Sequence, residues 1–304
     1  MDEKVFRDTR TQIGILKSRG IKIKSKKFAK QILLNINYYN LINGYKIPFI
    51  ATTTPYETYL SGTNFNEIYA LYEFDRKLRI LTLEVILKIE KQVKSTIAYC
   101  FSKEHGHKDY LSYNNFDSIG KNKYLHVSDL FNSLYKKIVL NIDKDHSITH
   151  YVDGKNYIPL WVLVNTLSFG DMSKFYSNML SHDRNEVAKR IKWGLREDYM
   201  SSCLIFISSI RNRCAHDELL YSYQSYAFIK QNPYLKYFHR TDTNNYFSNL
   251  VAFKMILSQR EYALYQEALE ELFNKLSKQL STINISKIRN LMGFPGNWTR
   301  LKTL

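Results

Sequence analysis

The strongest constraint on the fold is a long stretch without helix breakers. No proline or glycine lies between Asn64 and Gly106. Asn64 and Glu67 have the spacing of a capping box and Gly106 is a stop signal, so the sequence predicts one long helix between them. We expect a mainly helical, all-α fold with a few short irregular or strand segments. The apolar stripe of the long helix is Ile68, Tyr72, Ile86, Ile89, Val93 and Ile97.

Three charged residues of this helix lie on or beside its apolar stripe. Asp75 and Arg79 are four residues apart and face each other on a helix, so we expect them to form an ion pair with a structural role. Glu90 lies about 16 Å further along and needs another partner. Lys94, one turn later, is one candidate, and a polar motif near residue 211 is the other.

The polar motif lies within the apolar segment 205–219. Arg211, Asn212 and His216 follow apolar residues at helical spacing, so we expect them at or near the end of a buried helix over about residues 197–221. Burying arginine and histidine without partners is unfavourable. Either the fold supplies internal partners or the site is open to a ligand such as a phosphate.

The spacing of the motif indicates how such a site is completed. Asn212 and His216 share one face of a helix, whereas Arg211 and His216 diverge by about 140°. Either the arginine bends towards the histidine, or a second copy of the motif faces the first across a two-fold axis. We favour the second arrangement, and hence a homodimer. Glu90 is the carboxylate expected to orient Arg211 or His216, with simple pairing to Lys94 as the alternative.

Net charge is concentrated at the two ends of the chain. Of the formal +16, residues 1–46 carry +8 and residues 274–304 carry +6, which leaves +2 for the residues between. A composition typical of an AT-rich genome explains the abundance of lysine but not this segregation. We therefore expect cationic surfaces that bind a polyanion.

Tyrosines follow the N-terminal cluster of lysines. Lysines that pair with phosphates and aromatic rings that stack on unpaired bases are typical of RNA-binding surfaces. The alternative, that the tyrosines pack in the core beneath a lysine-rich face, stays open. The expected RNA-contacting residues are Lys22, Lys24, Lys26, Lys27, Lys30, Tyr38, Tyr39, Lys287 and Arg289.

Cap and stop signals predict the remaining elements. Two segments rich in turn-forming residues, 51–63 and 222–248, are expected to be loops. A C-terminal turn carries Phe294 and Trp298, which either pack onto the body or stack on a base. The other expected helices span about residues 4–19, 25–37, 128–142, 159–170, 183–194 and 258–280.

Cysteine and histidine spacing argues against disulfides and metal sites. The cysteines show no paired spacing, which favours reduced thiols in the cytoplasm. No histidine pair is joined by cysteine or further carboxylates at ligand spacing, so we expect no metal and no cofactor. The first residues do not resemble a signal peptide, and no membrane association is expected. The residues concerned are Cys100, Cys203, Cys214, His105, His107, His146 and His150.

Several motifs resemble one protein family. Arg211-x4-His216, with Asn212 after the arginine, resembles the R-x(4–6)-H motif of the HEPN ribonuclease superfamily. The string 210–216 is similar to that of the Abi-like (Abi_2) abortive-infection proteins of the AbiD and AbiF type. Asn165 departs from the family pattern, which often has glutamate there, so an acidic role at this position is in doubt. Further segments that resemble the family are 38–45, 72–79, 88–90, 157–170 and 293–298.

The resemblance implies a HEPN-like helical bundle with basic N- and C-terminal extensions. Residues 61–222 would form the core with the motif, residues 1–60 a basic and aromatic region that contacts RNA, and residues 223–304 a helical region with a basic tail. The implied activity is metal-independent endonucleolytic cleavage of RNA, in a bacterial phage-defence or toxin–antitoxin system. No DNA partner is expected.

The same resemblance implies roles for the motif residues and a second function. Arg211 would stabilise charge on the phosphate, Asn212 would orient it or the imidazole, and His216 would transfer the proton. Alternatively, the protein is a stable ribonucleoprotein, like the AbiF-type proteins associated with small noncoding RNAs, and is silent until triggered. A purely structural helical protein explains neither the charge segregation nor the motif.

Overall fold

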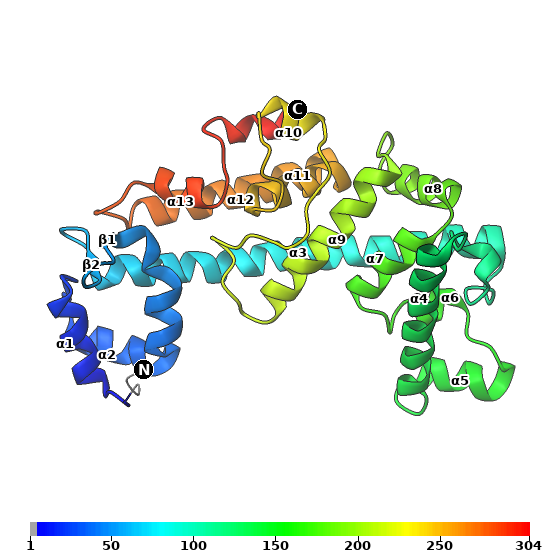
Figure 1. Ribbon diagram of the computed structural model, residues 1–304, viewed down its shortest axis with the longest axis horizontal. Coiled ribbons are helices and arrows are strands. Elements are labelled where there is room, and N and C mark those ends of the chain that lie inside the picture. Colours follow the sequence, from blue (N-terminus) through cyan, green and yellow to red (C-terminus); the bar gives the residue numbers. More distant parts are fainter. Residues whose placement is uncertain (1–4) are drawn as a thin grey trace.

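The computed structural model describes residues 5–304, and the chain is built along one very long helix (Figure 1). This helix, α3, covers Phe65–His105, 41 residues, or about 60 Å at 1.5 Å per residue. Asn64 caps its start by accepting the Glu67 N–H at 3.2 Å, and Gly106, with a φ of 89°, ends it. The predictions of one unbroken helix here and of a mainly helical fold are confirmed.

The N-terminal elements gather at the start of α3 (Figure 1). Asp8 caps the first helix by accepting the Thr11 N–H, so this helix begins later than residue 4, which lies outside the described residues. Ser25 caps the second helix as expected. A short hairpin forms within the segment expected to be a loop. These elements are α1 (Thr9–Ser18), α2 (Lys26–Ile36), a π-helical turn (Tyr39–Asn43), a 3₁₀ turn (Ile47–Phe49), β1 (Ile50–Thr52) and β2 (Thr58–Tyr59).

The middle of the chain forms a second group at the other end of α3 (Figure 1). The helix expected over 159–170 is wrong: α6 lasts one turn, and Ser168 and Asp171 form a capping box that starts α7. Gly170 therefore lies inside a helix, where a Cβ would meet the Ser208 hydroxyl at 3.3 Å. The elements are a 3₁₀ turn (Tyr113–Asn115), α4 (Lys121–Asn141), α5 (His146–Lys155), α6 (Leu160–Leu163), α7 (Phe169–Asn178) and α8 (Ser181–Ile191).

The remaining helices pack against α3 or against the helix that crosses it. Ser258 and Glu261 form the predicted capping box of α12, which packs along α3. Phe294 and Trp298 are buried and contact each other edge to face, so they pack onto the body and are not free to stack on a base. The elements are α9 (Glu197–Ala215), α10 (Pro233–Tyr237), α11 (Tyr246–Ile256), α12 (Gln259–Ser277), α13 (Ile285–Leu291) and a 3₁₀ turn (Trp298–Lys302).

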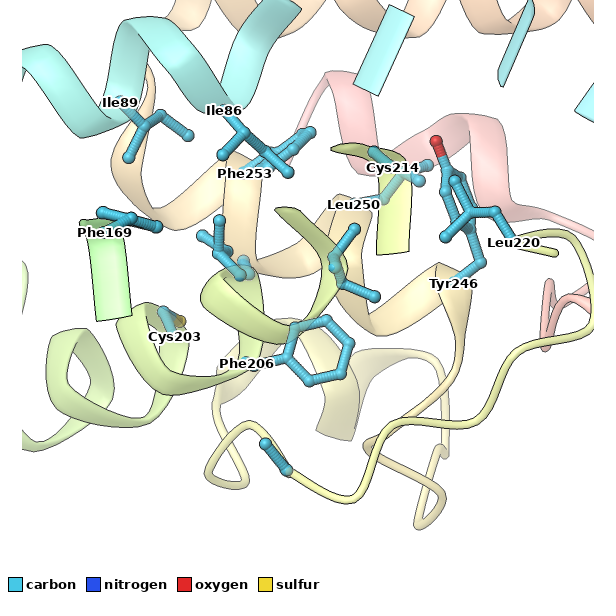
Figure 2. Packing of buried hydrophobic residues seen from close by; sticks show 14 of the residues in the cluster. Ile86, Ile89, Phe169, Cys203, Phe206, Cys214, Leu220, Tyr246, Leu250 and Phe253 are labelled. Atoms are coloured by element: carbon cyan, nitrogen blue, oxygen red, sulfur yellow. The ribbon is translucent and has the colours of Figure 1, made fainter. Parts of the chain in front are cut away.

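A central part of the core lies where α3, α9 and α11 meet (Figure 2). Burying each large apolar side chain there stabilises the fold by roughly 2 kcal/mol, so this packing fixes the position of α9. Every residue of α11 is buried, so its sequence has no polar face that marks an amphipathic helix. The loop expected over 222–248 is therefore wrong at its end, where α11 begins, and it is also wrong in its middle, where Asn232 caps the short helix α10. The core residues labelled in the view include Ile86, Ile89, Cys203, Phe206, Leu250 and Phe253.

Within residues 5–304, no helix is both long and apolar enough to cross a bilayer.

Glu67 joins the C-terminal segment to the start of α3. Its carboxylate accepts the backbone N–H groups of Ser281 and Thr282 at 3.0 and 2.9 Å and both of their hydroxyls at 2.7 and 2.8 Å. The capping box is therefore only half formed, because this carboxylate serves the C-terminal segment. Nearby, the Lys22 N–H donates to the Thr63 carbonyl at 2.8 Å. Segments of both cationic ends of the chain are thus fixed at the start of α3.

Replacing Glu67 by glutamine should cost stability in a pH-dependent way. Burial raises the pKa of Glu67, but the hydrogen bonds from Ser281 and Thr282 outweigh it and hold that pKa below its usual value. The carboxylate therefore stabilises the fold above the unfolded-state pKa of about 4.3, and this contribution is lost as the pH falls through the lower folded-state pKa. We expect Glu67→Gln to lower the free energy of unfolding by about 2 kcal/mol at pH 7.

Urea denaturation at neutral and acidic pH measures this effect. The difference from wild type should shrink on acidification below about pH 4. Glu271→Gln is the control, because Glu271 is exposed and pairs only loosely with Lys275, at 3.8 Å. A cost for Glu67→Gln that equals that of the control, or that does not change with pH, would contradict the proposed clamp.

Candidate functional site

The polar motif lies at the C-terminal end of α9. This helix ends at Ala215, earlier than the predicted residue 221, and His216 is its C-cap. The N–H groups of Asp217 and Glu218 donate back to carbonyls of the last turn in the pattern of a Schellman motif. Asp217 takes the left-handed conformation, with a φ of 55°, where glycine is usual. A non-glycine residue there needs compensation from its surroundings.

A buried ion pair of α3 supplies that compensation. Arg79 donates to Asp75 at 2.6 Å and to Asp217 at 2.6 Å. The fully buried Asp75 carboxylate also accepts the N–H groups of Leu220 and Tyr221 at 3.1 and 2.7 Å. The predicted pairing of Asp75 with Arg79 is confirmed. The ion pair also holds the turn that follows the motif and the segment that follows this turn.

Burial keeps the other groups around this network neutral. Burial and the neighbouring Asp75 carboxylate raise the pKa of Tyr45, whose hydroxyl donates to Asp75 at 2.8 Å, so this tyrosine belongs to the core. The three cysteines are free thiols. Burial raises the pKa of Cys214, in the last turn of α9, to about 12, so its thiol is neutral and does not act as a nucleophile.

Arg211 lies beside Glu90 without being hydrogen-bonded to it. Arg211 Nε is 3.9 Å from Glu90 Oε2, and both atoms are buried without a hydrogen-bond partner in residues 5–304. The other oxygen of Glu90 is 2.8 Å from Lys94 Nζ. Glu90 thus lies within ion-pair distance of both candidate partners. Because the Arg211 side chain is 31% exposed, its guanidinium can still reach a ligand from solvent.

Asn212 and His216 are exposed at the end of α9. Within the described part of the chain, the His216 side chain enters no ion pair and neither side chain is hydrogen-bonded, so both are free to contact a ligand. Arg213 differs, because it pairs with Glu218 and its guanidinium lies 4.0 Å over the ring of Tyr223. Arg211 is therefore the arginine of the motif that remains available.

A groove between α3 and α6 begins at Glu90. Its volume is about 870 Å³. Cations and aromatic rings line it together, a combination suited to phosphates and unpaired bases. Asn165 also lines the groove and donates to the Trp161 carbonyl at 3.3 Å. Position 165 therefore contributes an amide to the groove and not a carboxylate. The cationic and aromatic lining residues are Lys91, Lys94, Tyr99, Lys103, His107 and Trp161.

This groove was not predicted from the sequence. A usable signal was present, since Leu87, Lys91 and Lys94 recur at helical spacing on one face of α3. The exposed Trp161 belongs to α6, and only the fold brings it opposite that face.

The predicted RNA-contacting residues differ in exposure. Tyr39 is 66% exposed, whereas Tyr38 is half-buried. The guanidinium of Arg289 lies 5.1 Å from the ring centroid of Phe273, and burial lowers the pKa of Arg289, so this arginine packs on the body. The exposed lysines among them are Lys22, Lys24, Lys26, Lys27, Lys30 and Lys287.

The two cationic ends of the chain meet in one groove. N-terminal Lys24 and C-terminal Lys275 and Lys278 line it together with Lys77 of α3, and its volume is about 630 Å³. Part of the charge from each end of the sequence is therefore brought together near the start of α3.

The family comparison covers the motif and its supports. A model of the family described as Abi-like protein matches residues 31–222, a range that includes the Asp75–Arg79 pair and the segment from Arg211 to His216. No curated protein and no solved structure matches the chain.

Removing the Asp75 carboxylate should be strongly destabilising. Asp75→Ala leaves Arg79 buried without its partner and frees two backbone N–H groups, so the free energy of unfolding should fall by about 3–5 kcal/mol. Arg76→Ala is the matched control, one position along the same helix, where the pair with Glu73 is partly exposed and the cost should be within about 1 kcal/mol. Urea denaturation measures both, and similar small costs would show that the network is dispensable.

Proposed function

The chain belongs to the Abi-like protein family, and we propose that it is an RNA-binding endoribonuclease of the HEPN type. The family description points to abortive infection, a form of phage defence. The observation that carries the proposal is the solvent-accessible trio Arg211, Asn212 and His216 at a rigidly held helix end. In the proposed role, the trio acts on a ribose-phosphate in the cytoplasm.

RNA carries its own nucleophile, the 2′-hydroxyl, so the proposed reaction needs only proton transfer and charge stabilisation. His216 removes the 2′-hydroxyl proton, since imidazole is the side chain suited to this near neutral pH. Arg211 donates to the phosphate oxygens as negative charge builds up. The 2′-oxygen bonds to phosphorus, the bond from phosphorus to the 5′-oxygen breaks, and this oxygen takes up a proton from water, which yields a 2′,3′-cyclic phosphate and a 5′-hydroxyl. Asn212 orients the phosphate or the imidazole.

The direction of the Arg211 side chain favours a site shared between two copies. It leans towards Glu90, whereas His216 lies beyond the end of α9 beside the Asp217 turn. Exposed apolar side chains flank the motif on both helices, as expected of a surface that packs against a second copy. These are Ile80, Leu87 and Ile205.

A stable ribonucleoprotein is the second candidate function. The groove shared by both cationic ends supports it, because a surface that joins the two termini can hold a structured RNA permanently. Sequencing the RNA that copurifies with wild type and with His216→Ala separates the two functions. One discrete species with unchanged ends favours the ribonucleoprotein, and ends that depend on the histidine favour the nuclease.

Replacing His216 by alanine should abolish cleavage without weakening RNA binding. Loss of the general base should slow cleavage of a pool of single-stranded oligoribonucleotides by at least about 100-fold. Affinity should not change, because the exposed lysines and not His216 make the proposed contacts to phosphates. His126→Ala, an exposed histidine of α4, is the control and should cleave normally. Equal activity of the two variants would refute the role of His216.

Reversing charge on the N-terminal lysines should have the opposite effect. A variant with glutamate at Lys22, Lys24, Lys26 and Lys27 should bind RNA more weakly and with a shallower dependence on salt, because fewer counterions are released. The control reverses four exposed lysines of the α4–α5 region: Lys121, Lys136, Lys144 and Lys155. Filter binding over a salt series measures both, and equal losses would show that only net charge matters.

Co-expression of two inactive variants tests the shared site. If Arg211 of one copy acts with His216 of the other, mixed dimers of Arg211→Ala and His216→Ala each contain one intact site. About half of the dimers should be mixed, so activity should return to about a quarter of wild type. A site within one copy predicts no recovery.

A further inference from the structure

A cluster of metal-binding side chains lies away from the proposed RNA site. His105, at the end of α3, meets His182 and Asp183 of α8, and one ligand atom from each lies within 4.8 Å of the others. His105 Nε2 is 2.8 Å from one oxygen of Asp183, and His182 Nε2 is 3.1 Å from the other. The expected absence of a metal site relied on neighbours in sequence such as His107. The fold instead pairs His105 with a carboxylate 78 residues away.

Asp183 is a buried carboxylate that has no lysine or arginine of the described chain within ion-pair distance. It is 4% exposed, and its ion-pair partners within the described chain are the two histidines. The helix predicted over 183–194 placed Asp183 at its start, which is wrong, because α8 begins at Ser181 and the Asp183 carboxylate contacts His105 of α3. When both imidazoles are neutral, they can donate hydrogen bonds but cannot balance its charge. A bound cation would remove the cost of that buried charge.

We propose that His105, His182 and Asp183 bind one divalent transition-metal ion of the zinc class. Two imidazoles and a carboxylate are typical zinc ligands, whereas magnesium and calcium prefer oxygen ligands throughout. With metal–ligand bonds of about 2.0–2.2 Å, tetrahedral ligand atoms lie about 3.3 Å apart. The two nitrogen–oxygen separations, 2.8 and 3.1 Å to different oxygens of Asp183, are close to this value, and all three ligand atoms lie within 4.8 Å of one another, so side-chain shifts of about 1 Å bring them to it. Each imidazole must then carry its proton on Nδ1, so that Nε2 can bind the ion.

A cavity beside the cluster leaves room for a fourth ligand. Its volume is about 570 Å³, and it is lined by His182 and Asp183 together with Lys103 and Arg190. Three protein ligands and one water molecule therefore complete a tetrahedral site. The bound ion ties the end of α3 to α8. Two residues after α8 ends, the chain turns towards α9.

The site is separate from the R-x4-H motif. It lies about 22 Å beyond Glu90 along α3, at 1.5 Å per residue. The ion therefore takes no part in the proposed attack by the 2′-hydroxyl, and its binding does not depend on whether the protein cleaves RNA.

Cobalt titration of the untagged chain, after removal of metal with a chelator, tests the proposal. Tetrahedral Co²⁺ absorbs visible light, so one equivalent should produce ligand-field bands that Zn²⁺ then abolishes. Calorimetry should find one zinc ion per chain. His182→Ala should weaken binding at least about tenfold. Since the His182 side chain is 62% exposed, this change should leave the fold intact, and circular dichroism checks that it does.

Two further variants make the test specific. Asp183→Asn keeps the size of the side chain but removes its charge, and it should also weaken binding at least about tenfold. His126→Ala should bind Co²⁺ like wild type. Absence of stoichiometric binding to wild type, or equal affinity in His182→Ala, would overturn the proposal and leave a hydrogen-bonded trio.

Discussion

The buried ion pair between Asp75 and Arg79 is the interaction on which the candidate site depends. Arg79 holds Asp217 in its left-handed conformation, and Asp75 holds the backbone that follows. Helix ends normally fray, but this one is fastened to the longest helix of the molecule. His216 can therefore be exposed to solvent and still be fixed in position, which a residue that transfers protons requires.

Each proposed site lies on or beside the helix α3. The joined cationic ends lie around its first turns, the R-x4-H motif crosses its middle, and the groove with Trp161 follows the second half. An RNA bound along this helix would meet lysines on both sides of the motif. The proposed metal site at its far end would fasten α8 and so support the start of α9.

Local patterns in the sequence predicted where several elements begin, but not what their polar side chains contact. The long helix was predictable because no residue breaks it, and the α12 capping box at Ser258 because both partners are three residues apart. Glu67 had the right spacing for a similar box, yet it binds Ser281 and Thr282 across the fold. No local rule could show a contact between segments so distant in sequence.

The position of the polar motif was predictable from the sequence, and its geometry only in part. The apolar run before Arg211 placed the motif near a helix end, as the structure has it. The exact stop at Ala215 was missed, because it depends on an aspartate in the conformation usual for glycine, held by Arg79. The helix α11 was missed for a different reason: it is buried on every side, so its sequence shows no alternation of polar and apolar faces.

The most direct test of the proposed chemistry is a single 2′-deoxy substitution in an RNA that the protein cleaves. The cleaved linkage is first mapped, and the 2′-hydroxyl on its 5′ side is then replaced by hydrogen. The account predicts that cleavage at that linkage stops while binding is unchanged, because the nucleophile is gone. Continued cleavage there would show that the attacking group is not the 2′-hydroxyl and would contradict the proposed role of His216.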